Sequence, residues 1–204
     1  KHSGLQITQP LSGVKPLKRV EKPALVQFLA PGFDVKEAPL QITNVNFLRY
    51  RHDGVLVAGG YNGKIHLLRD TDGDGIEDTS SLYWESETIR AIMGMAVTPK
   101  GDPRGDGVFV ATLGRVAFVL DKNGDGKGDA EIVVADGWAP PQRLAGGASD
   151  CLGLALDRDG SVWFSLGTKN MNSAYVPDDA GKMTYNIEDE RGSIWRVWAD
   201  FKAR

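Results

Sequence analysis

Short runs of apolar and β-branched residues, separated by polar turns, follow one another along most of the chain. Two of these runs, Lys64–Arg69 and Arg115–Leu120, each come just after a glycine and end at an aspartate-rich turn. Each is preceded by an Asp-Gly turn that opens another apolar run, Asp53–Ala58 in the first case and Asp106–Ala111 in the second. No stretch has the apolar period of an amphipathic helix. The pattern predicts an all-β protein.

The order of these runs repeats along the chain. Further apolar runs stand before each pair, at Asn46–Tyr50 and Ile92–Val97, and after each pair, at Leu82–Trp84 and Ile132–Val134. Each unit therefore has four predicted strands, and the unit recurs after 51 residues, from Asp70 to Asp121. Four-stranded units of this length are typical of β-propeller blades. We predict blades at about 42–86, 90–137 and 150–204.

The third unit departs from the first two. Its strands Cys151–Leu156, Asp159–Ser165 and Gly192–Val197 are followed by no fourth run, and a long polar insertion, Thr168–Arg191, separates the second from the third. Propellers close with typically 4–8 blades, so we expect residues 31–204 to be a partial ring that pairs with further blades. Residues 1–30, which are rich in proline and basic residues, are predicted to be a linker or pre-blade segment.

Composition excludes several classes of protein. The 204 residues carry 24 Lys and Arg against 27 Asp and Glu, a formal charge of −3, which gives no electrostatic footprint for a nucleic acid. No apolar run approaches the ~18 residues of a transmembrane segment. The single cysteine, Cys151, excludes an intrachain disulfide.

Two copies of one acidic turn carry the clearest chemistry. Residues 70–78 and 121–129 both follow the pattern D-x-[DN]-G-D-G-x-x-D, which alternates oxygen-bearing side chains with glycines that permit a tight bend. An all-oxygen donor set without His or Cys selects a hard cation, and a flexible loop suits Ca²⁺ better than Mg²⁺. The expected ligands are the side chains of Asp70, Asp72, Asp74 and Asp78, those of Asp121, Asn123, Asp125 and Asp129, and the main-chain carbonyls of Ile76 and Lys127.

The alternatives for these turns are an EF-hand and a simple polar hairpin turn. The bidentate Glu of an EF-hand would fall at Ser81 or Ile132, which cannot serve, and no helical pattern flanks either turn. A polar turn without a bound ion stays open. The first loop is expected to bind calcium more tightly, because Lys122 and Lys127 reduce the negative charge of the second.

The polar insertion supplies the candidate ligand residues Thr168, Lys169, Asn170 and Arg191, since long loops on rigid scaffolds often carry sites. For Lys169 and Arg191, a surface salt bridge is the competing role. No catalytic residue can be assigned. Of the three histidines, only His66 lies within a predicted strand.

The segments Ala30–Lys36, Leu154–Gly160 and Glu190–Arg196, together with the acidic loops, resemble the planctomycete-type membrane-bound dehydrogenase propellers. These are grouped with propellers like soluble quinoprotein sugar dehydrogenases and are often joined to c-type haem domains. The resemblance covers about residues 28–204. It implies a six-bladed, calcium-containing, periplasmic or extracellular domain, with pyrroloquinoline quinone and a sugar or polyol ligand in the full-length protein. The chain lacks a C-x-x-C-H haem motif and a histidine assignable as a quinoprotein base.

Two functions therefore remain open. The chain is part of a quinone-dependent sugar or alcohol dehydrogenase, active only within the full-length protein, or it belongs to a non-catalytic, adhesion-type propeller that binds carbohydrate or protein in a calcium-dependent manner. The acidic loop does not discriminate between them, because it suits both.

Overall fold

The structure is a computed structural model that describes residues 31–32, 35–138, 150–167, 180–182 and 191–202. Contacts divide the chain into two units, Lys1–Glu37 and Ala38–Arg204. Every strand of the described residues belongs to the second unit, and no helix occurs among them. Accordingly, the described part offers no helix that could cross a membrane.

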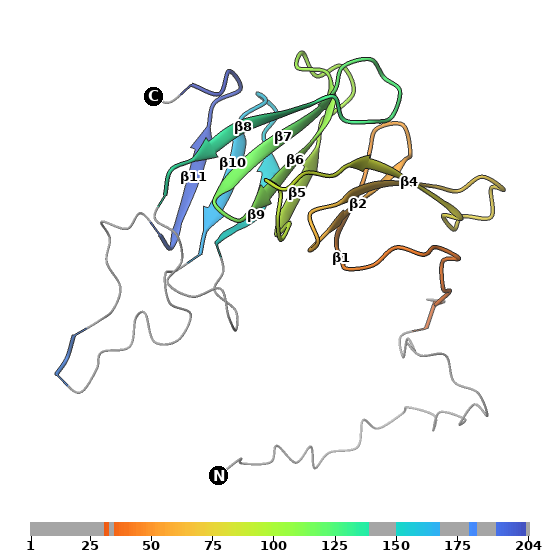
Figure 1. The fold of residues 1–204 in the computed structure, drawn as a ribbon, viewed down its shortest axis with the longest axis horizontal. Helices are drawn as coiled ribbons and strands as arrows, with labels where there is room; N and C mark the ends of the chain where they lie inside the picture. Colours follow the sequence, from red (N-terminus) through yellow and green to blue (C-terminus); the bar gives the residue numbers. More distant parts are fainter. Residues whose placement is uncertain (1–30, 33–34, 139–149, 168–179, 183–190, 203–204) are drawn as a thin grey trace, which may run out of the picture. The chain divides into compact units, whose positions relative to one another are not determined.

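The strands form three antiparallel sheets (Figure 1). The first sheet contains β1 (Val45–Tyr50), β2 (Leu56–Gly60), β3 (Ile65–Arg69) and β4 (Thr79–Trp84). The second contains β5 (Gly94–Val97), β6 (Asp106–Thr112), β7 (Arg115–Asp121) and β8 (Ala130–Asp136). The third contains β9 (Cys151–Leu156), β10 (Val162–Leu166) and β11 (Ser193–Val197). Within each sheet the strands are neighbours in chain order.

The second sheet is buried on both faces, which explains the unbroken apolar run in β6. Val108 and Val110 pack with Ile65 and Leu67 of the first sheet. Phe109, with Phe118 of β7, packs against Phe164 and other residues of the third sheet. Successive side chains of a strand point to opposite faces, so one strand serves both interfaces. The middle sheet thus joins its two neighbours.

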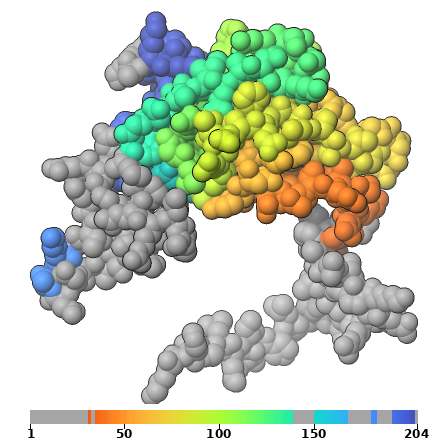
Figure 2. All heavy atoms as spheres, in the orientation of Figure 1, coloured from red at the N-terminus to blue at the C-terminus, as the bar shows by residue number. Residues whose placement is uncertain are grey.

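The first strands of the three sheets lie together, because β5 is adjacent to both β1 and β9. Sheets that pack face to face in succession, with their first strands gathered at one side, are blades of a propeller. The all-β prediction and the partial-propeller prediction are confirmed, and the described residues contribute three strands to the third sheet. In the space-filling view, the green residues of the second acidic loop and of β8 lie directly beside the yellow residues that follow β3 (Figure 2).

Strand direction separates the two regions that the sequence marks as functional. The acidic loops follow the third strand of their sheets, β3 and β7, whereas residues 168–190 follow the second strand of theirs, β10. Consecutive antiparallel strands run in opposite directions. The acidic loops therefore lie at one end of the sheets, and the described ends of the insertion, Gly167 and Arg191, lie at the other.

Candidate metal loops and a buried ion pair

In the first acidic loop, the carboxylates fold the backbone around themselves. The carboxylate of Asp70 accepts hydrogen bonds from the amides of Gly73, at 2.7 Å, and Gly75, at 2.8 Å. Asp72 accepts from the amide of Asp74 at 3.1 Å, and Asp74 from that of Ile76 at 2.8 Å. The turn is possible because Gly73 and Gly75 adopt φ values of 79° and 87°, a region that disfavours other residues.

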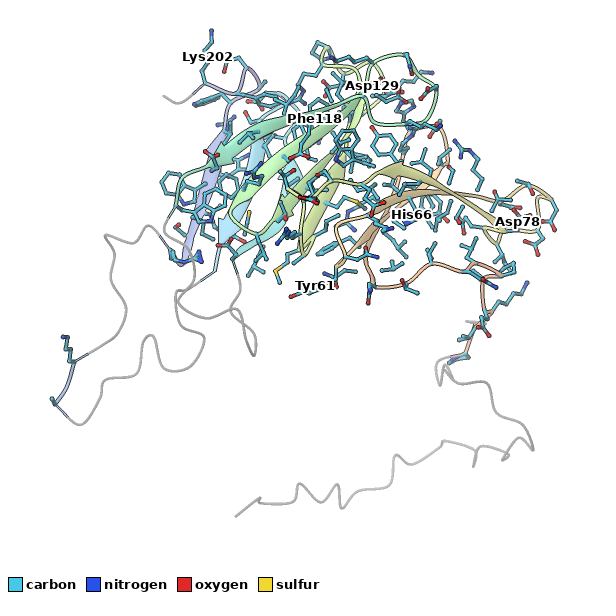
Figure 3. The ribbon with its side chains drawn as sticks, viewed as in Figure 1. Tyr61, His66, Asp78, Phe118, Asp129 and Lys202 are labelled. Carbon is cyan, nitrogen blue, oxygen red and sulfur yellow. The ribbon has the colours of Figure 1, made fainter. Side chains whose placement is uncertain are left out.

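The second loop repeats this network position by position. Asp121 accepts from the amides of Gly124 and Gly126, at 2.7 and 2.9 Å, and Asn123 accepts from that of Asp125 at 2.9 Å. At the ninth position, Asp129 accepts from the amide of Lys122 at 2.6 Å, as Asp78 does from Thr71 at 3.2 Å. The shared motif therefore folds into the same local structure in both loops, whose ninth residues, Asp78 and Asp129, are labelled in Figure 3.

Three carboxylates of the first loop converge. One oxygen from each of Asp70, Asp72 and Asp78 lies within 4.8 Å of the others, and Asp74 is outside this group. The pKa of the Asp70 carboxyl lies below its ordinary value, chiefly because the amide of Gly75 donates to it. Three ionised carboxylates this close repel one another unless a cation lies between them, and hard oxygen donors of this kind fit Ca²⁺. The donor set therefore fits the predicted ion.

In the second loop, the described carboxylates form no such group of three, because Asn123 replaces the aspartate of the third position. The order of calcium affinity expected from charge is compatible with this difference and stays a prediction. Ser81 and Ile132, the positions of an EF-hand glutamate, both lie within strands, in β4 and β8. Ligation by the carbonyls of Ile76 and Lys127 stays a prediction as well.

The second loop is also part of the joint between the first two sheets. The amide of Gly128 donates to the carbonyl of Tyr83 at 2.8 Å, and the hydroxyl of Tyr83 donates to the carbonyl of Val119 at 3.1 Å. A Cβ on Gly128 would stand 2.8 Å from the ring of Trp84, so only glycine allows this approach. The first loop has Glu77 at this position, where it accepts from the hydroxyl of Tyr50 at 2.8 Å.

A buried ion pair lies at the opposite end of the sheets. The guanidinium of Arg191 donates to the carboxylate of Asp150 at 2.9 and 2.8 Å, and the side chains are only 2% and 1% exposed. Asp150 also accepts from the indole of Trp138 at 3.0 Å and from the amide of Gly114. Its own carbonyl accepts from the amide of Gly167 at 2.8 Å.

Through these bonds, Asp150 connects three places in the fold. Trp138 follows β8, Gly167 follows β10, and Arg191 precedes β11. The alternative that Arg191 forms a surface salt bridge is wrong: its partner is internal, and both charges are removed from water. The remaining candidates of the insertion, Thr168, Lys169 and Asn170, lie outside the described residues.

Asp150 is a residue that sequence reasoning missed. It precedes a strand without any motif, and 41 positions separate it from Arg191. Burial lowers the pKa of His66 below its ordinary value, with a smaller contribution from Lys64, and so favours the neutral imidazole.

The three successive sheets place the chain among the β-propellers. The calcium structure of a Trichoderma reesei protein of Carbohydrate-Active Enzymes Family AA12 superposes with a TM-score of 0.57 at 12% identity, over 81% of this chain and 38% of that one. An iodide structure of the same family gives 0.59 at 13% identity, over 84% and 40%. The holo form of the pyranose dehydrogenase PQQ domain from Coprinopsis cinerea gives 0.56 at 12% identity, over 78% and 34%.

The chain belongs to the family described as a domain of unknown function, DUF7133, whose model matches residues 45–200. It spans between 34% and 40% of the length of these solved structures. At such low identity these structures share the fold alone. No curated protein sequence matches the chain.

Proposed function

We propose that this chain is the calcium-binding part of an extracytoplasmic, six-bladed propeller that oxidises a sugar or alcohol with a bound quinone. The observation that carries the calcium assignment is the convergence of Asp70, Asp72 and Asp78 within 4.8 Å. The fold shared with a PQQ domain supports the bound quinone, which we propose to be pyrroloquinoline quinone in the full-length protein. When bound, such a quinone accepts the hydride from the substrate.

The residues of this chain have a structural part in that proposal. Calcium held by the first loop would offset the repulsion between its carboxylates and fix the turn between β3 and β4. The second loop would fix the turn between β7 and β8 and, through Gly128 and Tyr83, its contact with the neighbouring sheet. A sugar site, in turn, would be formed at the opposite end of the sheets, where Asp150 and Arg191 lie.

The calcium part is tested on this chain. At ~100 times the Kd, a bound ion stabilises a fold by about 2.7 kcal/mol, so calcium should raise the melting temperature relative to EDTA. Asp72→Asn and Asp74→Asn should reduce that rise and the calorimetric affinity more than Asn123→Ala and Asp125→Asn. Glu77→Gln is the control, because it removes a charge from the first loop without removing an expected ligand. Equal melting of all variants with and without calcium would refute the assignment.

The quinone part is tested on the full-length protein. It is reconstituted with pyrroloquinoline quinone and calcium, and dye reduction is measured with a panel of sugars and polyols. A complete lack of turnover, together with calcium-dependent binding on a glycan array, would favour the non-catalytic, adhesion-type propeller instead.

A further inference from the structure

The second acidic loop, residues 121–129, lies against the third strand of the first sheet. A Cβ on Gly126 would stand 3.6 Å from the side chain of Leu67 and 3.6 Å from Nη2 of Arg69, and both of these residues belong to β3. Leu67 is buried in the core that joins the first two sheets. Residues two apart in a strand point to the same face. Arg69, at the end of β3, therefore extends that face towards the loop of the neighbouring sheet.

The guanidinium of Arg69 has no carboxylate partner of its own. In the described residues, its side chain makes no ion pair and one hydrogen bond, from Nη1 to the hydroxyl of Ser81 at 3.4 Å. A hydrogen bond of that length is weak. Arg69 directly precedes the first loop, but the carboxylates of Asp70 and Asp78 accept from backbone amides and from Thr71 instead. The positive charge of Arg69 is thus left to act on the second loop.

The two acidic loops differ strongly in charge. Residues 70–78 hold five carboxylates and no basic side chain, whereas residues 121–129 hold three carboxylates and two lysines. The guanidinium of Arg69 brings a third positive charge to the second loop from outside its own sequence. The internal repeat does not require this arginine, because the residue at the same distance after the strand-opening glycine of the second unit is Leu120.

We propose that Arg69 is a built-in counter-cation of the second acidic loop, supplied by the neighbouring sheet, and that it sets the calcium affinity of that loop. The inference rests on the calcium assignment of the proposed function and deepens it. A divalent cation that enters the second loop meets the fixed charge of Arg69, and the repulsion between them opposes binding. Because a guanidinium stays protonated in proteins, this effect is present at every working pH.

The test uses the whole chain with the first loop disabled. Asp72→Asn and Asp78→Asn remove two of the three converging carboxylates, so that the second loop dominates calcium binding. In this background, Arg69→Gln removes the positive charge and Arg69→Lys keeps it. Lys64→Gln is the matched control, because Lys64 precedes β3 and removes the same charge at the opposite end of that strand from the acidic loops.

Trp84 provides a readout that belongs to the second loop. Its ring would stand 2.8 Å from a Cβ on Gly128, so a terbium ion bound in this loop receives excitation from the tryptophan, and calcium that displaces the terbium reduces the luminescence. For a separation of about 8 Å between the guanidinium and the ion, Arg69→Gln should raise the association constant for calcium roughly three- to sevenfold in ~50 mM salt. In ~1 M salt this gain should disappear, because the Debye length falls to about 3 Å. Arg69→Lys and Lys64→Gln should leave the constant nearly unchanged.

The failure of this inference and the failure of the calcium assignment are distinguishable. Equal calcium affinity of Arg69→Gln and Lys64→Gln, with terbium still bound, would overturn the role of Arg69 and leave the calcium assignment standing. A gain that persists in high salt, or that Arg69→Lys shows as well, would indicate a change in packing and would overturn the role of Arg69 too. A lack of terbium and calcium binding in every variant would overturn the calcium assignment of the second loop and this inference with it.

Discussion

The ion pair between Asp150 and Arg191 gives the sharpest prediction for stability. Replacing Asp150 with Ala leaves the guanidinium of Arg191, which is 2% exposed, without its counterion. Removing one partner of a buried pair costs about 3–5 kcal/mol, because the remaining charge stays out of water. The indole of Trp138 and the amide of Gly114 lose their acceptor at the same time. We therefore expect a loss of at least about 3 kcal/mol.

The assay is urea unfolding followed by circular dichroism and by tryptophan emission, with the slope m compared between variants to verify that both unfold the same surface. The control is Glu85→Ala. Glu85 forms an ion pair with Lys64 at 3.0 Å, but the two side chains are 50% and 38% exposed. Exposed pairs of this kind contribute about 0–1 kcal/mol.

A second variant separates charge from packing. Adding Arg191→Met to Asp150→Leu removes both charges, so it should recover the part of the loss that comes from the unpaired charge, whereas the indole of Trp138 and the amide of Gly114 still lack their acceptor. The reasoning is refuted if Asp150→Ala costs no more than Glu85→Ala, or if the double replacement is less stable than Asp150→Ala alone.

Three further predictions concern single residues. Gly128→Ala should cost about 1–3 kcal/mol in urea unfolding, because its Cβ would overpack against Val119 and Trp84, while Gly153→Ala, whose nearest neighbour is 3.8 Å away, should be close to neutral. Burial raises the pKa of the Cys151 thiol from 9.0 to about 12, so its contribution to stability is complete below the unfolded pKa and is lost as pH rises through 12. Labelling of the native protein by iodoacetamide at pH 8 should therefore be far slower than labelling in urea. Equal rates would contradict this. The hydrogen bonds from Arg51 lower the pKa of Asp53 from 3.8 to about 2, so the contribution of Asp53 to stability is present above pH 3.8 and disappears as pH falls through 2. Asp53→Asn should flatten this part of the curve of stability against pH. An unchanged slope would contradict the assignment.

The alternation of apolar and polar residues, by itself, determined the strands and their grouping. It predicted the all-β fold and three strands for the third sheet because each strand is a short apolar run bounded by turn residues, which is a local property of the sequence. The inner structure of both acidic loops is equally local. Asp70 and Asp121 bond amides three and five residues further on, and the glycines between them take positive φ whatever the rest of the chain does.

Contacts between residues far apart in the chain were decided only by the tertiary structure. The pairing of Asp150 with Arg191 turns an expected surface arginine into a buried one, because the pairing of β9, β10 and β11 in one sheet brings together two residues that are 41 positions apart. In the same way, Gly128 looks like an ordinary loop glycine until Tyr83 and Trp84 of the neighbouring sheet come against it. Local sequence fixes which backbone turns form, whereas burial and charge pairing depend on which surfaces the blades bring into contact.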